Sequence, residues 1–214
     1  MTTSIRRARI DDAEFLAWVM LSASRAHLAQ GGWDLFIGAD EAACLDYLRR
    51  LAVAEPRSLC HYESFLVAEV DGQPGGALSS FEINAGGWAT VGEAMANVQR
   101  DLGWTERDMA CSQERVAPVW ACFLPDVGAD WGIENVASRS ECRRRGLARM
   151  LVEHSLREGS ERGCKLAQIT TYIGNDAALS VYEKSGFRFS DERRCSAMAS
   201  VLDAPGFVRL IRRL

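Results

Sequence analysis

The sequence lacks the features that would place it in a membrane, in a secretory pathway or around a metal ion. No apolar run approaches the roughly 20 residues that span a bilayer, and no long apolar core follows the basic residues near the start. The three histidines lie far apart and the seven cysteines form no CxxC pair, so no metal site is expected. We therefore expect a cytoplasmic protein with reduced cysteines and no membrane partner.

The chain also lacks an excess of basic residues. Its formal net charge is −4, which argues against a nucleic-acid partner. The 214 residues, 48% of them apolar, suit one well-buried domain over residues 1–214. No internal repeat and no low-complexity linker divides the chain.

Residues 131–163 combine a strand pattern, a polar turn and a helical pattern. Three arginines and Gly146 stand where the helix begins. The first turn of a helix has backbone N–H groups without intrahelical partners, and these groups bind anions such as phosphate. The arginines suit a diphosphate, because guanidinium groups bind phosphate oxygens in pairs. Taken alone, however, these residues favour an ordinary solvated helix start, since neither GxxxxGK[ST] nor GxGxxG is present.

Two spaced motifs make this region similar to the GNAT N-acetyltransferases. Residues 143–148, RRRGLA, fit the family's acetyl-coenzyme A signature [RQ]-x-x-G-x-[GA]. Residues 175–187 fit a second signature, N-x-x-A-x-x-x-Y-x-x-x-G-F, without a gap. Either motif alone is weak, but both in this order, separated by one helix and one strand, are specific. The resemblance implies an α/β (α+β) fold, with a mixed sheet of about six to seven strands flanked by helices.

The resemblance also implies which residues hold acetyl-coenzyme A, the co-substrate. Backbone groups at the end of the central strand, which splays from its neighbour in this family, would pair with the pantetheine arm. Backbone N–H groups of the turn and helix start would hold the pyrophosphate, and the second motif would contact the arm. The residues concerned are Val136, Ala137, Ser138, Arg143, Arg144, Arg145, Gly146, Leu147, Ala148, Arg149, Asn175, Ala178 and Tyr182.

Two residues are expected to carry the chemistry. Tyr182 has the family role of donating a proton to the departing thiolate, and it lies seven residues after Asn175, so both can face one cleft. A core tyrosine with a satisfied hydroxyl is the alternative. Glu134 is the candidate base because it lies just before the proposed donor site. Alternatively, Glu134 binds a cationic substrate or pairs with an arginine. Ser140 departs from the family pattern, which often has a proline in this turn.

Residues 84–113 fit the family core least and are expected to form a helical insertion. A capping box of Thr90 and Glu93 is expected to start its first helix. The insertion either shapes acceptor choice or only covers an edge of the sheet. Trp33 and Phe36 could line the acceptor site, or be ordinary core or surface aromatics.

Periodicity and turn residues predict the remaining elements. Strands are expected over 4–10, 64–70, 76–83, 115–124, 131–138, 164–172, 187–199 and 207–212, and helices from 12, over 41–54, from 90, from 105, over 144–162 and over 175–185. Asp71-Gly72 predicts a hairpin turn, and Asp11 and Asp40 are expected helix caps.

Together these features predict an N-acetyltransferase that moves an acetyl group from acetyl-coenzyme A to a primary amine. A small-molecule amine is favoured, attacking directly in a ternary complex. The alternatives are a non-catalytic acyl-coenzyme A binding or sensing protein of the same fold, and an acetyltransferase for protein N-termini or lysines. A homodimer is considered because dimers are frequent in the family.

Overall fold

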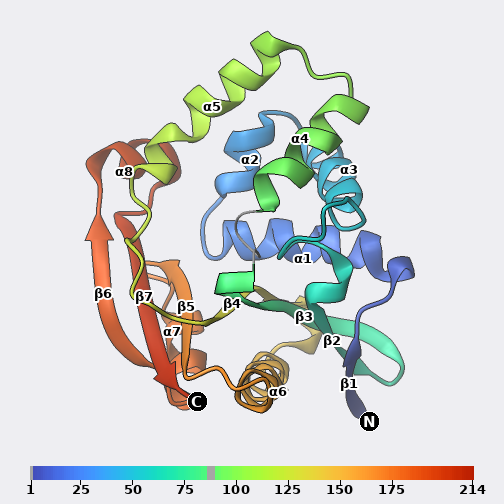
Figure 1. Cartoon of the computed structure of the whole chain (residues 1–214), viewed down its shortest axis with the longest axis vertical. Coiled ribbons are helices and arrows are strands. Elements are labelled where there is room, and N and C mark those ends of the chain that lie inside the picture. The colour runs from blue at the N-terminus through green and yellow to red at the C-terminus, as the bar shows by residue number, and fades with distance from the viewer. Residues whose placement is uncertain (1, 86–89) are drawn as a thin grey trace.

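A seven-stranded mixed sheet forms the centre of the computed structural model, which describes residues 2–85 and 90–214 (Figure 1). The strand order is β1-β2-β3-β4-β5-β7-β6. Only β4 and β5 pair in parallel, and the other neighbours are antiparallel. The strands are β1 Thr3–Arg7, β2 Phe65–Val70, β3 Gln73–Glu82, β4 Trp131–Ser138, β5 Leu166–Tyr172, β6 Arg188–Arg194 and β7 Gly206–Arg213. The expected mixed sheet flanked by helices is confirmed.

Helices cover both faces of the sheet and bury two apolar cores. The face called here the α1 face carries α1 Ala13–Arg25, α2 Gly32–Ile37, α3 Glu41–Leu51, α4 Val91–Asp101 and α5 Glu106–Trp120. The opposite face, called the α6 face, carries α6 Leu147–Glu161 and α7 Asp176–Lys184. A short helix, α8 Ser196–Leu202, joins β6 to β7. No helix of the part described is long and apolar enough to cross a bilayer.

One expected turn and one expected helix cap are confirmed. Asp71 and Gly72 have φ values of 49° and 79°, as the tight turn between β2 and β3 requires. The Asp40 side chain accepts a hydrogen bond from the Ala43 N–H and caps α3. Two other expected caps are wrong. Asp12, not Asp11, precedes α1, and the Thr90 hydroxyl donates to the Arg57 carbonyl instead of forming a capping box.

The expected strand over 115–124 is wrong, because α5 continues through this region to Trp120 with Pro118 inside it. A reciprocal capping box between Thr105 and Asp108 starts the helix. Ser112, Val116 and Val119 are buried at helical spacing. Pro118 removes one hydrogen bond near the end of the helix, where few further turns depend on it.

Three other boundaries differ from expectation. The strand expected over 187–199 ends at Arg194, and α8 follows because Met198 and Leu202, four residues apart, are both buried. Gly32–Ile37 forms α2 where a loop was expected. Finally, α6 begins at Leu147 and not near Arg144, because Arg144 and Gly146 adopt positive φ angles of 63° and 75°.

The insertion is longer than expected, since α5 extends beyond residue 113. Its residues 86–89 lie outside the described part. An aromatic cluster attaches it to the α1 face: Trp104 packs against Phe36 and Tyr47, with ring centroids 5.8 and 5.7 Å apart. Phe36 is buried in this cluster and Trp33 lies at its edge. Both aromatics therefore contribute to helix packing.

Candidate active site

The site is built around a gap between β4 and β5. The two strands pair at only three positions, the last joining Ile133 to Ile169. Both strands continue further, to Ser138 and Tyr172. From Glu134 onward, the edge of β4 that faces β5 has no strand partner among the described residues. Unpaired backbone groups at such an edge can bind an extended ligand.

A bulge in β4 lies at the start of this gap. The β3–β4 register shifts so that Ser79 pairs with Glu134 and Ala77 with Ala137. Asn135 has a φ of 54°, which a residue other than glycine seldom adopts. Its Nδ2 donates a hydrogen bond of 3.0 Å to the Ser79 Oγ, which holds this conformation. The bulge redirects the backbone at the mouth of the gap.

Glu134 carries an unpaired carboxyl group inside the gap. No described residue forms a hydrogen bond or ion pair with it, so the expected alternative of an arginine partner is wrong. Burial raises the pKa of Glu134 to about 8. Burial, and then the Glu134 carboxylate, raise the pKa of Cys60 to about 12 and also raise the pKa of Tyr182. Cys60 lies on the α1 face and Tyr182 on the α6 face, so the charge of the Glu134 carboxylate influences groups on both faces of the sheet.

Tyr182 approaches the gap from α7. It is buried, and its ring packs against Phe187 with centroids 6.4 Å apart. Its hydroxyl has no hydrogen-bond partner among the described residues, unlike an ordinary core tyrosine. Because burial and the Glu134 carboxylate raise its pKa, the phenol stays protonated at neutral pH and can act as a donor.

Asn175 fixes the start of the helix that carries Tyr182. Its Oδ1 accepts a hydrogen bond from the Ala178 N–H, and its Nδ2 donates to the Thr171 Oγ1 at 2.9 Å. Both ends of the amide are therefore used to cap α7. This capping role explains why an asparagine suits the first position of the second motif. The expected contact of Asn175 with the coenzyme arm stays a prediction.

The turn after β4 leads into the start of α6. The first bond of the helix joins the Met150 N–H to the Gly146 carbonyl at 2.9 Å. The N–H groups of Leu147, Ala148 and Arg149 therefore precede the intrahelical ladder and are available to an anion. A Cβ built at Gly146 would meet no heavy atom within 4 Å, so the space beside the helix start is open.

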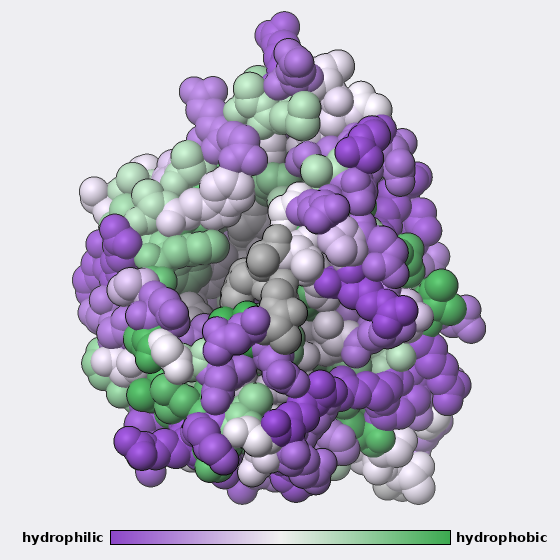
Figure 2. All heavy atoms as spheres, viewed as in Figure 1, coloured by the Kyte–Doolittle hydropathy of each residue, from purple (hydrophilic) through white to green (hydrophobic). Residues whose placement is uncertain are grey.

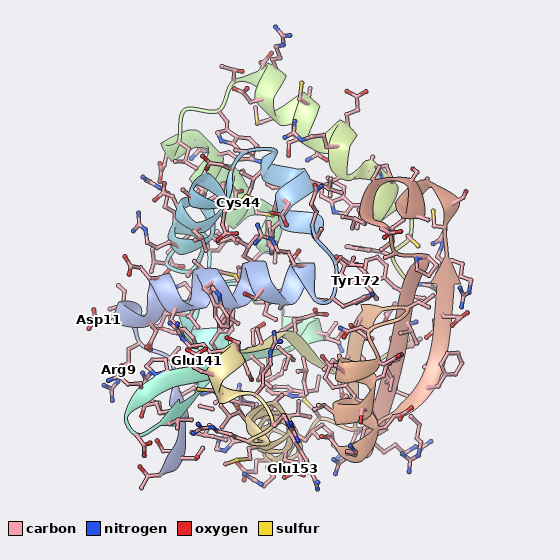
Figure 3. All side chains as sticks on the ribbon, turned by 180° about the vertical axis from the view of Figure 1, so that it is seen from behind. Arg9, Asp11, Cys44, Glu141, Glu153 and Tyr172 are labelled. Atoms are coloured by element: carbon pink, nitrogen blue, oxygen red, sulfur yellow. The ribbon has the colours of Figure 1, made fainter. Side chains whose placement is uncertain are left out.

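The arginines of this turn have different surroundings. Arg143, Arg144 and Arg145 are exposed. The Arg149 guanidinium forms an ion pair of 2.7 Å with Glu153, one helical turn further on, so its side chain lies along the helix. Figure 3 shows Glu153 on α6 and Glu141 on the turn beneath α1. Because Glu153 pairs with Arg149, the basic charge around the helix start comes mainly from residues 143–145, which precede the helix.

Sequence reasoning missed Arg139, which attaches this turn to α1. Its guanidinium lies over the rings of Phe15 and Trp18, 5.3 and 5.4 Å from their centroids. The backbone N–H of Arg139 donates a hydrogen bond to the Gly75 carbonyl at 2.9 Å. Arg139 could be read from the sequence as one more basic residue of the turn, but nothing near it indicated a contact with aromatic rings on a helix more than 100 residues earlier.

The geometry fits a ligand with an extended amide-containing arm and a diphosphate. The open edge of β4 suits the arm, and the helix start suits the diphosphate. The Ser138 Oγ is buried at the end of β4 without a hydrogen-bond partner in the described chain. Among the same residues, no cluster of three or more His, Cys, Asp or Glu could hold a metal ion.

Comparisons with known proteins agree with this geometry. The acetyltransferase (GNAT) family model matches residues 33–187. The ribosomal protein bS18-alanine N-acetyltransferase of Salmonella typhimurium is 38% identical over 60 residues, which is 28% of this chain and 40% of that protein. The match thus spans less than half the length of this curated relative.

Solved structures share the fold along nearly the whole chain. One acetyltransferase crystal structure superposes with a TM-score of 0.70 at 15% identity, covering 98% of each chain. The Drosophila melanogaster polyamine N-acetyltransferase, which catalyses formation of N-acetylagmatine, superposes with a TM-score of 0.58 at 15% identity, covering 100% of each chain. The family match, two spaced motifs and this fold agree. The chain therefore belongs to the acetyltransferase (GNAT) family.

Proposed function

We propose that this enzyme acetylates a primary amine of a small molecule by direct attack, with both substrates bound. The observation that carries the proposal is the unpaired carboxyl of Glu134, which lies at the gap between β4 and β5 with a raised pKa. Glu134 is half-buried, and a carboxyl group withdrawn from water is ordinarily paired or hydrogen-bonded. An unpaired one at the open end of a strand is suited to receive a cationic amine and to remove its proton.

In this proposal, the coenzyme lies along the open edge of β4 and the start of α6. Backbone groups of residues 136–138 pair with the arm, and the N–H groups of residues 147–149 bind the diphosphate. Residues 143–145 add positive charge around it. When bound, acetyl-coenzyme A supplies an activated thioester. Asn175 and Ala178 contribute by fixing α7 beside the arm.

Glu134 and Tyr182 divide the proton transfers. The ionised form of Glu134, which is the minor form at pH 7 because the pKa is about 8, accepts the proton of the ammonium group and is a stronger base than an ordinary glutamate. The neutral amine can then attack the acetyl group. Tyr182 donates its phenolic proton to the departing sulfur, and its raised pKa keeps that proton in place until the thiolate forms. The attacking nitrogen loses its second proton as the amide forms, and this proton restores the tyrosine hydroxyl. No covalent enzyme intermediate is required.

A small acceptor is favoured by a hollow in the surface on the α1 side of the sheet. Figure 2 shows this hollow near the centre of the view, just below the place where Figure 1 draws α2. Helices α2, α4 and α5 rise around it. The structural similarity to a polyamine N-acetyltransferase supports the same choice. A second candidate, acetylation of protein N-termini, is supported by the 60-residue match to an alanine N-acetyltransferase.

An acceptor screen tests the proposed function. Release of free thiol from acetyl-coenzyme A is measured with small primary amines and with peptides that begin with alanine. We expect small amines to give the highest kcat/KM. Faster turnover with the peptides would favour the second candidate, and thiol release unchanged by any acceptor would contradict both.

A pair of variants at Gly146 tests the coenzyme site. Glutamate and glutamine are equally strained by the φ of 75°, but only glutamate adds negative charge near the proposed diphosphate. We expect Gly146→Glu to bind coenzyme A at least about tenfold more weakly than Gly146→Gln in calorimetry. Equal Kd values for the two folded variants would show that no anionic group binds there.

The role of Tyr182 is tested by removing its hydroxyl. Tyr182→Phe should lower the single-turnover rate by about 10²–10⁴-fold, the range typical of general acid catalysis, with nearly unchanged coenzyme binding. Tyr62→Phe is the matched control, because this tyrosine lies in the short turn Tyr62–Ser64 before β2. A Tyr182→Phe rate equal to that of the control would rule out the tyrosine as the acid.

A further inference from the structure

A row of aromatic rings leads away from the gap between β4 and β5. Tyr172, the last residue of β5, stacks on Phe207 of β7 with ring centroids 5.2 Å apart. Phe207 in turn meets Phe123 edge to face at 5.5 Å. The row therefore crosses the ends of β5 and β7 and reaches the segment that follows α5.

The row lies on the same side of the sheet as the Glu134 side chain. Ile133 belongs to the core on the α6 face, so its neighbour Glu134 points toward the α1 face. Tyr172 and Phe207 pack with the core on the α1 face. The last parallel pair joins Ile133 to Ile169; Glu134 follows this pair directly on β4, and Tyr172 ends β5 three residues, or about 10 Å, beyond it. An amine at Glu134 would thus have the row as its next neighbour.

The segment that carries Phe123 is held firmly against the β6–β7 pair. The buried Cys122 thiol donates to the Arg193 carbonyl at 3.4 Å, and the Arg193 Nη1 donates back to the Phe123 carbonyl at 3.0 Å. Arg209 is buried, forms an ion pair with Asp191, and donates from its Nη1 to the Pro125 carbonyl at 2.7 Å. The position of Phe123 is therefore fixed before any ligand arrives.

Phe123 is nevertheless 47% exposed. Its ring contacts Phe207 edge to face, and about half of its surface remains open to solvent. Figure 2 shows apolar surface beside the hollow, on the side where Figure 1 draws the segment after α5 and the ends of β5 and β7. Figure 3 shows Tyr172 at the end of β5, near the chain that leaves α1. Tyr172 is only 7% exposed and its hydroxyl donates to the Ser24 carbonyl at 2.9 Å, so Tyr172 supports the row from behind and Phe123 is its exposed member. A rigid aromatic ring exposed beside a reaction centre can bind a flat apolar group at little entropic cost.

We propose that this row, Tyr172–Phe207–Phe123, binds an aromatic ring of the acceptor, so that the substrate is an arylalkylamine. Its primary amine would lie at Glu134, and a short linker would place its ring on the row. The inference rests on the proposed function, because it takes Glu134 as the position of the amine. It adds the chemical class of the group attached to that amine.

The charges near the row favour a ring over a second cation. Asp191 is bound by Arg209, and Asp34 is bound by Arg25 at 2.7 Å. A diamine or agmatine would bring a second positive group to this region and would have to compete with these arginines. A neutral aromatic ring gains edge-to-face and stacking contacts without displacing an ion pair.

The test compares phenethylamine, hexylamine and agmatine as acceptors for the wild type, Phe123→Ala and Phe189→Ala. Phe189 is the matched control because it is an exposed phenylalanine, 62% accessible, on the outer strand β6. We expect kcat/KM for phenethylamine to exceed the other two by about tenfold or more. Phe123→Ala should remove about tenfold of this preference and leave coenzyme affinity unchanged, while Phe189→Ala should change neither.

Binding to the protein loaded with coenzyme A, measured by calorimetry, separates this inference from the proposed function. If no amine is acetylated, the proposed function fails, but phenethylamine binding that is weakened by Phe123→Ala and not by Phe189→Ala would still support the aromatic row. The inference is overturned if agmatine or hexylamine is used as well as phenethylamine. It is also overturned if the two alanine variants behave alike, or if phenethylamine does not bind.

Discussion

The early end of pairing between β4 and β5 is the constraint on which the rest of the site depends. A parallel pair normally continues along both strands, but here it stops after Ile133 and Ile169, while the strands run on. The bulge at Asn135 and the cation–π contacts of Arg139 with α1 keep the second half of β4 apart from β5. One gap thereby provides an open backbone edge, a route between the two faces, and a position for one carboxyl group.

Leaving Glu134 unpaired in that gap has a cost to the folded protein. Its folded pKa of about 8 lies above the ordinary value of 4.5, so the unfolded chain releases this proton at lower pH. Native stability therefore falls as the pH rises between the two values. An ion pair would remove that cost but would also occupy the carboxylate. The cost has a purpose if the partner of Glu134 is the ammonium group of the substrate, while Tyr182 donates a proton to the leaving thiolate.

The sequence predicted the parts of the site whose signals are local. Gly146 and the motif from Asn175 to Phe187 mark a helix start and a capped helix, and both are present. The second half of α5 was mistaken for a strand over 115–124 because Pro118 and its apolar neighbours suggested that the helix starting at Thr105 was short. The aromatic row could not be predicted, since only the pairing of β5 with β7 brings its rings together. Contacts made by tertiary structure leave no short sequence pattern.

The central claim is that Glu134 is an unpaired, half-buried carboxyl group at the reaction centre. The most direct measurement is a pH titration of the protein with ¹³C-labelled glutamate side chains, followed by NMR, in which the Glu134→Gln variant identifies the Glu134 signal. The account predicts a titration midpoint near pH 8 for Glu134 in the free protein. A midpoint near the ordinary value of 4.5 would mean that the carboxyl is solvated or paired, and would contradict the account.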